Sequence, residues 1–83
     1  MWFIYIIKCR DGRLYTGMTS DLKRRFEQHK RGKGARFTRS FGAEKLVYSE
    51  GVRTRKKAMK REAEIKRWPR PRKLALIRGN KSL

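Results

Sequence analysis

The sequence has very little cysteine and histidine: one of each among 83 residues. The single Cys9 cannot form an intramolecular disulfide bond, and no group of cysteines and histidines has the spacing of a zinc site. These absences exclude a disulfide-stabilised secreted domain and a zinc finger. They favour a reducing environment, so we expect a cytoplasmic protein.

Acidic residues and long apolar runs are also scarce. Seven Asp and Glu stand against 25 Lys and Arg, which gives a net charge of +18. The longest apolar run, residues 1–7, is much shorter than the ~20 residues that span a bilayer, and it lacks the features of a secretory signal. We therefore expect no membrane span. The charge attracts polyanions, and we rank nucleic acid ahead of a membrane surface or an acidic protein.

The residues that are present predict one small folded domain over residues 1–79, with a short tail at 80–83. Nine aromatic residues, together with clustered Ile, Leu and Val, argue for a real core. Periodicity and turn signals predict strands and helices in alternation. We expect strands at 2–9, 13–17 and 45–49, and helices at 21–30, 55–68 and 72–78. Residues 32–42 should form an irregular basic loop, with or without one helical turn.

The turn at Arg10-Asp11-Gly12 leaves two hairpin registers open. With a two-residue loop, Tyr15 pairs opposite Lys8 and lies on the face away from Tyr5. With a three-residue loop and a left-handed Gly12, Tyr15 pairs opposite Ile7 and shares a face with Tyr5. The sequence alone allows both.

One carboxylate looks misplaced on the helix at 55–68. On a helical wheel, Glu62 falls near the middle of an apolar arc made of Ala58, Met59, Ala63 and Ile65. An unpaired charge directed at the interior is costly. Glu62 is therefore either one partner of a buried or half-buried salt bridge, or a metal ligand or catalytic carboxylate.

The first helix carries a similar anomaly. Leu22, Phe26 and His29 form its apolar stripe, and Arg25 lies on the edge of that stripe. Phosphodiester hydrolysis needs a base, a cation for the developing charge and a Lewis acid for the leaving oxygen. Polar groups suited to these roles project from faces that should pack together: Tyr5, Tyr15, Arg25, His29 and Glu62.

The same residues carry a family resemblance. Phe3-Ile4-Tyr5 followed by Tyr15-Thr16-Gly17 resembles the paired tripeptides that name the GIY-YIG nuclease superfamily, with Phe3 in place of the first Gly and Thr16 in place of the Ile. The later residues follow in the family's order: Arg25 ten positions after Tyr15, then His29, then Glu62. The chain is most similar to the small stand-alone bacterial members.

The resemblance implies an α+β fold of order β-β-α-β-α-α. A small three-stranded antiparallel sheet would be flanked by helices, with both tyrosines on one face, which favours the three-residue loop. It also implies a metal-dependent DNA endonuclease, structure-selective or weakly sequence-selective, with one Mg²⁺ or Mn²⁺ at Glu62. Tyr5 would activate the water, Tyr15 would assist, Arg25 would stabilise the phosphorane, and His29 would contact the phosphate or share the base role.

Two further readings stay open beside the nuclease. A catalytically weak or inactive DNA- or RNA-binding module would use the same basic surface, and a basic assembly subunit would bind protein instead. Phe37 either stacks on an unpaired base or belongs to the core. We expect a monomer or weak dimer, with DNA ahead of RNA as partner, no membrane, and a targeting protein as a further partner. The predicted nucleic-acid contacts are Lys33, Arg36, Phe37, Thr38 and Arg39.

Overall fold

A three-stranded antiparallel sheet with two pairs of helices makes up the fold. The computed structural model describes residues 1–79, so the predicted tail at 80–83 lies outside the described residues. The strands pair in the order β2-β1-β3. In chain order the elements are β1 (Trp2–Cys9), β2 (Leu14–Thr19), α1 (Leu22–Lys30), α2 (Arg36–Phe41), β3 (Ala43–Val52), α3 (Arg55–Lys66) and α4 (Arg70–Gly79).

The hairpin between β1 and β2 has the three-residue loop. Gly12 has a φ of +91°, and the Cys9 amide donates to the Arg13 carbonyl at 2.8 Å. A left-handed third loop residue is the geometry that glycine adopts without strain. Ile7 consequently pairs with Tyr15, and Tyr15 lies on the same face as Tyr5.

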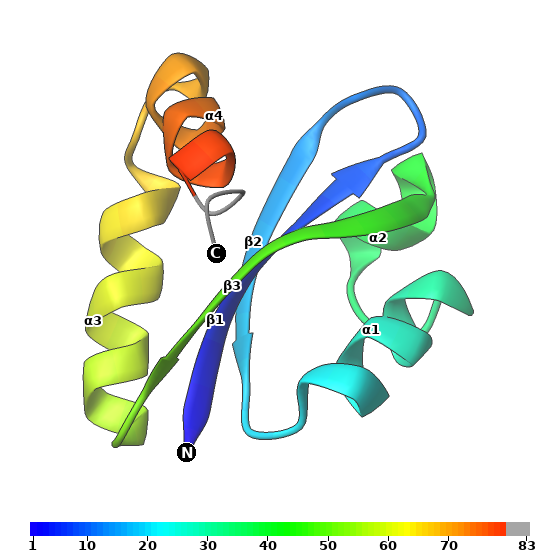
Figure 1. The fold of residues 1–83 in the computed structure, drawn as a ribbon. Coiled ribbons are helices and arrows are strands. Elements are labelled where there is room, and N and C mark those ends of the chain that lie inside the picture. Colours follow the sequence, from blue (N-terminus) through cyan, green and yellow to red (C-terminus); the bar gives the residue numbers. More distant parts are fainter. Residues whose placement is uncertain (80–83) are drawn as a thin grey trace.

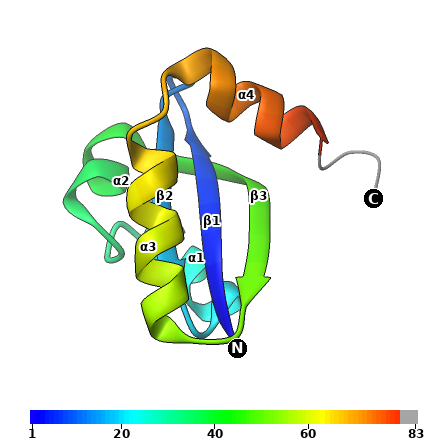
Figure 2. The ribbon, with the colours of Figure 1, turned by 90° about the vertical axis from the view of Figure 1, so that its left-hand side faces the viewer.

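The sheet separates two layers of helices (Figures 1 and 2). The α3 and α4 helices cover one face, and α1 and α2 cover the other. Ile4 and Ile6 of the central strand pack with Ala58 and Ile65 in the main apolar core. The opposite face of β1 carries Tyr5, so it is this face that receives the polar side chains of α1 and α2.

The caps explain where α1 begins and ends. The Asp21 carboxylate accepts a hydrogen bond from the Arg24 amide at 3.1 Å, which satisfies one of the free donors of the first turn. Gly32, with a φ of +76°, ends the helix as a left-handed residue. The predicted span of 21–30 therefore agrees with the structure to within one residue.

Residues 32–42 are more regular than we predicted. They contain α2, which is a six-residue helix rather than a loop with a single turn. Gly42, with a φ of +73°, ends it. A helix this short is set by tertiary packing rather than by its own propensity.

Other boundaries also differ from prediction. The β2 strand runs Leu14–Thr19 rather than 13–17. The β3 strand runs ten residues instead of five, since it pairs along the whole length of β1. The α3 helix ends at Lys66 rather than at residue 68. The α4 helix begins at Arg70, which puts Pro71 in its first turn, where a missing amide is tolerated.

The predicted apolar arc on α3 is wrong in part. Ala58 and Ile65 are buried, but Met59 is 53% exposed and Ala63 is exposed as well. The helix meets the sheet along a narrow stripe from Ala58 to Ile65, and positions three and four after Ala58 lie on that stripe. Arg61 and Glu62 occupy those positions and are half-buried.

Arg61 fixes α3 against β3. Its guanidinium donates two hydrogen bonds to the Glu50 carboxylate, from Nε at 3.0 Å and from Nη2 at 3.2 Å, and it also pairs with Glu64. The Tyr48 hydroxyl donates to Glu50 at 2.6 Å. This charge-assisted network holds the rotation of α3 and thereby the direction of its next residue, Glu62. Among residues 1–79, no helix is long and apolar enough to cross a membrane.

Candidate active site

Three aromatic rings from separate elements gather on the face of the hairpin that α1 and α2 cover. The Tyr5 and Tyr15 centroids are 6.4 Å apart, and His29 of α1 lies 5.6 Å from Tyr5 and 5.1 Å from Tyr15. Gly17, directly opposite Tyr5, leaves room for this arrangement, because a Cβ there would lie 2.5 Å from the Tyr5 hydroxyl. The three-residue hairpin loop thus brings both tyrosines to the only histidine of the chain.

A chain of hydrogen bonds runs from Tyr5 through His29 to α2. The Tyr5 hydroxyl lies 2.8 Å from His29 Nε2, and His29 Nδ1 lies 2.7 Å from Thr38 Oγ1. Thr38 donates to the Ala35 carbonyl at 3.2 Å, so its oxygen is free to accept from Nδ1–H. Nε2 then accepts the proton of Tyr5. Thr38 therefore selects the tautomer that points a lone pair at Tyr5.

Burial keeps this chain uncharged. It raises the pKa of Tyr5 to about 12, an effect that the neighbouring Arg25 partly offsets. Burial, with a smaller contribution from the charge of the nearby Arg25, lowers the pKa of His29 from 6.5 to about 4. Both groups have almost no exposed surface, 2% for Tyr5 and 1% for His29. At neutral pH, Tyr5 holds its proton and His29 offers a lone pair.

The pKa of His29 makes stability depend on pH. Between pH 6.5 and about 4, the unfolded chain takes up a proton at His29 that the folded chain does not. The free energy of unfolding should therefore fall as the pH is lowered through this window, by about 3 kcal/mol in all. Urea unfolding of the wild type and His29→Gln at several pH values measures it. In the variant, the free energy of unfolding should depend less steeply on pH in this window. Equal pH dependence in the two proteins would contradict the low pKa of His29.

Arg25 ties the loop before α2 to the site. Its guanidinium donates to the Gly34 carbonyl at 2.7 Å and to Gln28 Oε1 at 3.1 Å. Its charge also acts on both tyrosines and on His29. A cation in this position can stabilise negative charge that develops beside the tyrosine hydroxyls.

Gly34 lies against the ring of His29. A Cβ at residue 34 would fall inside contact distance of His29 Nδ1. We expect Gly34→Ala to lower the free energy of unfolding by about 1–3 kcal/mol, because the buried ring has no space into which to move. The midpoint of urea unfolding measures the loss. The control is Gly51→Ala, whose nearest neighbour is the exposed, flexible Met1 side chain. Equal losses in the two variants would refute the argument.

Glu62 comes from α3, whereas Arg25 and His29 come from α1. Its side chain is 22% exposed, and Lys66 Nζ lies 3.8 Å from Oε1. Besides burial, which is the larger effect, the Glu62 charge raises the pKa of Tyr15 and that of Tyr5. The carboxylate is thus close enough to both hydroxyls to act on them electrostatically, and the salt bridge we weighed for it is the weak one with Lys66.

Glu62 suits the divalent ion that the resemblance implies. Within residues 1–79 no group of three or more Asp, Glu, His or Cys side chains gathers, which excludes an all-protein cage for a cation. Mg²⁺ in phosphoryl-transfer sites keeps several waters and takes one or two carboxylates with substrate phosphates. A single half-buried carboxylate near the two tyrosines fits that mode of binding.

The predicted nucleic-acid residues lie in two different settings. Lys33, Arg36 and Arg39 are exposed and border a pocket of about 450 Å³. Phe37 is half-buried in an aromatic row, with its ring centroid 5.8 Å from that of Tyr15 and 4.9 Å from that of Phe41, and it also lines a pocket beside Leu14. Thr38 is 1% exposed and bonds His29 rather than reaching the surface. No sequence signal assigned Thr38 to His29, because the two meet only through the path of α2.

Comparison with known proteins agrees with this arrangement. The family model of the GIY-YIG catalytic domain matches residues 1–75. UPF0213 proteins of Staphylococcus aureus strains Mu3 and Mu50 are 49% identical over 76 residues, which is 92% of this chain and 93% of theirs. The solution NMR structure of a UPF0213 protein from Bacillus halodurans is 40% identical, with a TM-score of 0.59, over 93% of this chain and 83% of that one. The chain therefore belongs to the GIY-YIG family of catalytic domains, a nuclease superfamily.

Proposed function

We propose that this protein is a divalent-metal-dependent DNA endonuclease that hydrolyses phosphodiester bonds. A GIY-YIG domain implies a nucleic-acid substrate, and nucleases of this family generally use divalent metal ions. The observation that carries the proposal is the hydrogen-bonded chain Tyr5–His29–Thr38, with a cation and a carboxylate beside it. The net charge of +18 adds attraction for the substrate backbone.

The chain of hydrogen bonds supports a proton path. The Tyr5 oxygen takes a proton from the attacking water while the Tyr5 proton passes to His29 Nε2. The Nδ1–H group of His29 donates its hydrogen bond to Thr38 Oγ1 throughout, so the ring stays oriented. The pKa of about 12 at Tyr5 disfavours a free phenolate, so a transfer coupled to His29 suits this site better than a separate ionisation.

Arg25 and Tyr15 face the charge that grows on the phosphorus. The Arg25 guanidinium lies near both tyrosines, so it can offset that charge where the phosphorane forms. Tyr15 supplies a second hydroxyl beside Tyr5 as a hydrogen-bond donor. An ion held by Glu62, Mg²⁺ or Mn²⁺, would act as the Lewis acid for the leaving oxygen.

The selectivity that we propose is for DNA structure, or weakly for sequence. The described residues form this one sheet and its helices, and none of them adds a second DNA-reading element. A protein partner or a second copy in a weak dimer would then direct the choice of site.

The test is a cleavage assay on purified protein. Supercoiled plasmid and a set of flapped and branched duplexes are incubated with Mg²⁺ or Mn²⁺, and in parallel with a chelator. We expect nicking that requires the metal ion and that differs between substrate shapes. Tight binding with no cleavage of any substrate would refute the nuclease function.

That negative result would favour the second candidate, a nucleic-acid-binding module without chemistry. The observation in its favour is the net charge of +18, which by itself produces sequence-independent affinity that falls with salt. In that case the tyrosine and histidine cluster would serve packing.

A further inference from the structure

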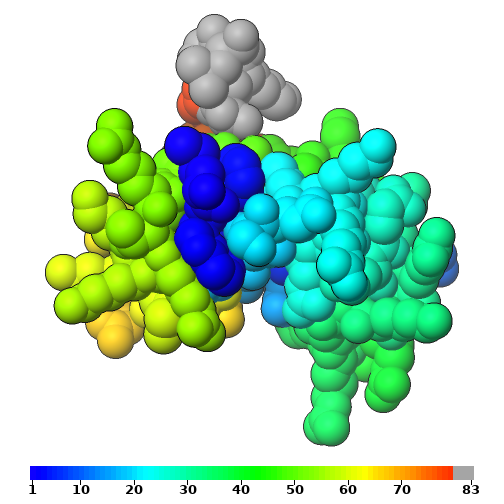
Figure 3. Space-filling model, turned by 90° about the horizontal axis from the view of Figure 1, so that it is seen from below, coloured from blue at the N-terminus to red at the C-terminus, as the bar shows by residue number. Residues whose placement is uncertain are grey.

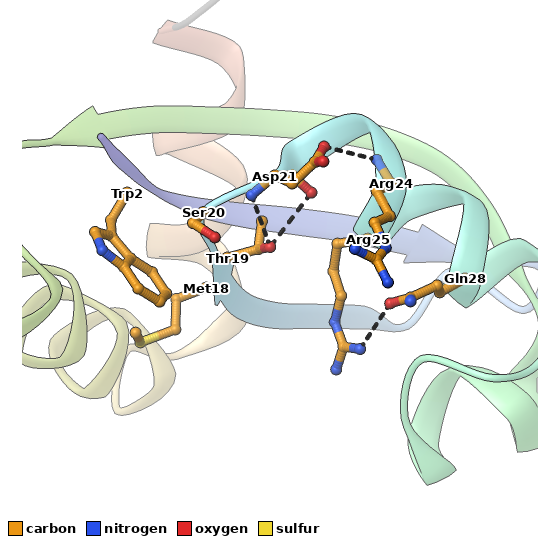
Figure 4. Close-up of a pocket in the computed structure, with 8 residues that line it drawn as sticks. All are labelled: Trp2, Met18, Thr19, Ser20, Asp21, Arg24, Arg25 and Gln28. Atoms are coloured by element: carbon orange, nitrogen blue, oxygen red, sulfur yellow. Dashed lines mark hydrogen bonds between the residues drawn. The ribbon is translucent and has the colours of Figure 1, made fainter.

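Two pockets lie at opposite ends of β2. The first, of about 310 Å³, is at the Thr19 end and is drawn in Figure 4. Trp2 and Met18 stand on one side of it, and Arg25 and Gln28 stand across from them. Its polar lining includes Arg24, whose amide rather than its guanidinium is used in the cap by Asp21.

The second pocket, of about 260 Å³, is at the hairpin end of the same strand. Leu14 and Phe37 supply its apolar wall. Its cations come from the residue that follows the hairpin loop and from the first turn of α4. The charged lining residues are Arg13, Arg70 and Lys73.

Each pocket shares a wall with the candidate active site. Arg25 lines the first pocket and its charge acts on both tyrosines, whereas Phe37 lines the second and contacts Tyr15 at a tilt, with ring centroids 5.8 Å apart. The site therefore lies between the two pockets, along the edge strand of the sheet. Viewed from below, the surface is hollowed between the side chains of α3 and those of α1 and α2, with N-terminal residues between them (Figure 3).

The two pockets share cations and an aromatic residue, and the first is also lined by Asp21, whose carboxylate caps α1. Arg24, Arg70 and Lys73 have no acidic partner within the described residues, since the ion pairs there engage other cations. Each pocket combines such free cations with an aromatic residue, Trp2 in one and Phe37 in the other. Cations with aromatic rings suit a strand whose bases are accessible, since a duplex presents mainly its phosphates.

We propose that a single strand of DNA lies along β2, held by the Trp2–Arg24 pocket at one end and the Arg70–Lys73 pocket at the other. The six residues of β2 span about 20 Å. At ~3.4 Å per nucleotide in a stacked strand, the path covers about six nucleotides. The position of the cut, over Tyr15 and Tyr5, rests on the proposed nuclease function, whereas the path of the strand does not.

Binding to fluorescein-labelled oligothymidylates in chelator tests the path without any chemistry. Lengths run from about four to about twelve nucleotides, and a duplex serves as competitor. We expect affinity per site to rise up to about six nucleotides and then to level off, with the duplex competing poorly. Affinity that climbs steadily with length, or equal competition by duplex, would overturn the proposal in favour of diffuse attraction.

Charge-removing variants test the two ends. Arg24→Gln and Lys73→Gln should each weaken binding about eightfold at ~50 mM salt and lower the salt slope by about 0.7. Lys45→Gln removes the same charge from an exposed site on β3, at the other edge of the sheet, and should leave the slope unchanged. An equal loss in the Lys45 control would overturn the proposal.

Tryptophan fluorescence gives a readout that does not depend on charge variants. Trp68→Phe leaves Trp2 as the only tryptophan, since the chain has two. Stacking of a base in the first pocket should quench Trp2 with the same midpoint as the anisotropy change. Unchanged fluorescence at saturation would refute that end of the path. A cleavage assay that fails while these binding results hold would refute the nuclease function alone.

Discussion

Glu62→Gln is expected to lower the rate of DNA cleavage about a thousandfold or more. The amide keeps the size of the side chain but removes the charge that would hold the divalent ion. A lost Lewis acid costs several kcal/mol of transition-state stabilisation, and each 1.4 kcal/mol is about tenfold in rate. Single-turnover cleavage of the preferred substrate at saturating protein measures the effect.

Glu64→Gln is the matched control, because Glu64 lies on the same helix and pairs with Arg61 instead of facing the tyrosines. Its cleavage rate should stay near that of the wild type. The affinity of Glu62→Gln for DNA in chelator should not fall, since the change removes a negative charge. A parallel loss of affinity and cleavage would mean that Glu62 positions the fold rather than a metal ion.

Tyr5→Phe is expected to lower cleavage by about a hundredfold to ten-thousandfold, the usual contribution of a positioned acid–base group. The ring still packs in the core, but the hydroxyl that donates to His29 is gone. The unpaired Nε2 should also lower the free energy of unfolding by about 1–3 kcal/mol. Cleavage kinetics and urea unfolding on the same preparation separate the two effects.

Tyr48→Phe removes a comparable hydroxyl on the other side of the molecule. Burial raises the pKa of Tyr48 to about 12 as well, and its hydroxyl donates to Glu50. We expect this control to lose stability but to retain its cleavage rate per folded molecule. Should both variants cleave equally well, Tyr5 would be a structural residue and the proton path would be wrong.

The sequence predicted those features that local rules determine. Turn glycines and caps placed the hairpin and α1, and periodicity predicted three strands and three of the helices, whereas the three-stranded sheet was implied by the family resemblance. The hairpin register stayed open because the turn sequence Arg10-Asp11-Gly12 is compatible with a loop of two residues and with a loop of three. The three-residue form, with Gly12 left-handed, is the one that joins Tyr5 and Tyr15.

The rest depends on tertiary packing that no local pattern contains. The α3 helix turns Met59 outward because Arg61 reaches Glu50 across the sheet, a contact between residues eleven positions apart on different elements. Thr38 meets His29 only because α2 folds back over α1. Its hydroxyl looked like a surface group in a basic loop, whereas it serves as the acceptor that fixes a ring tautomer.

The central position of β1 also bears on the order in which the chain folds. Its pairing with β2 closes a loop of three residues, whereas even the nearest pair of β1 and β3, Cys9 and Ala43, is 34 positions apart. The entropy of loop closure grows with chain separation, so the hairpin is the less costly of the two pairings to form first. The two tyrosines then meet early and locally, while Glu62 arrives only with the last helices. Partly folded chains would carry the full positive charge and the tyrosine pair before Glu62 is in place beside them.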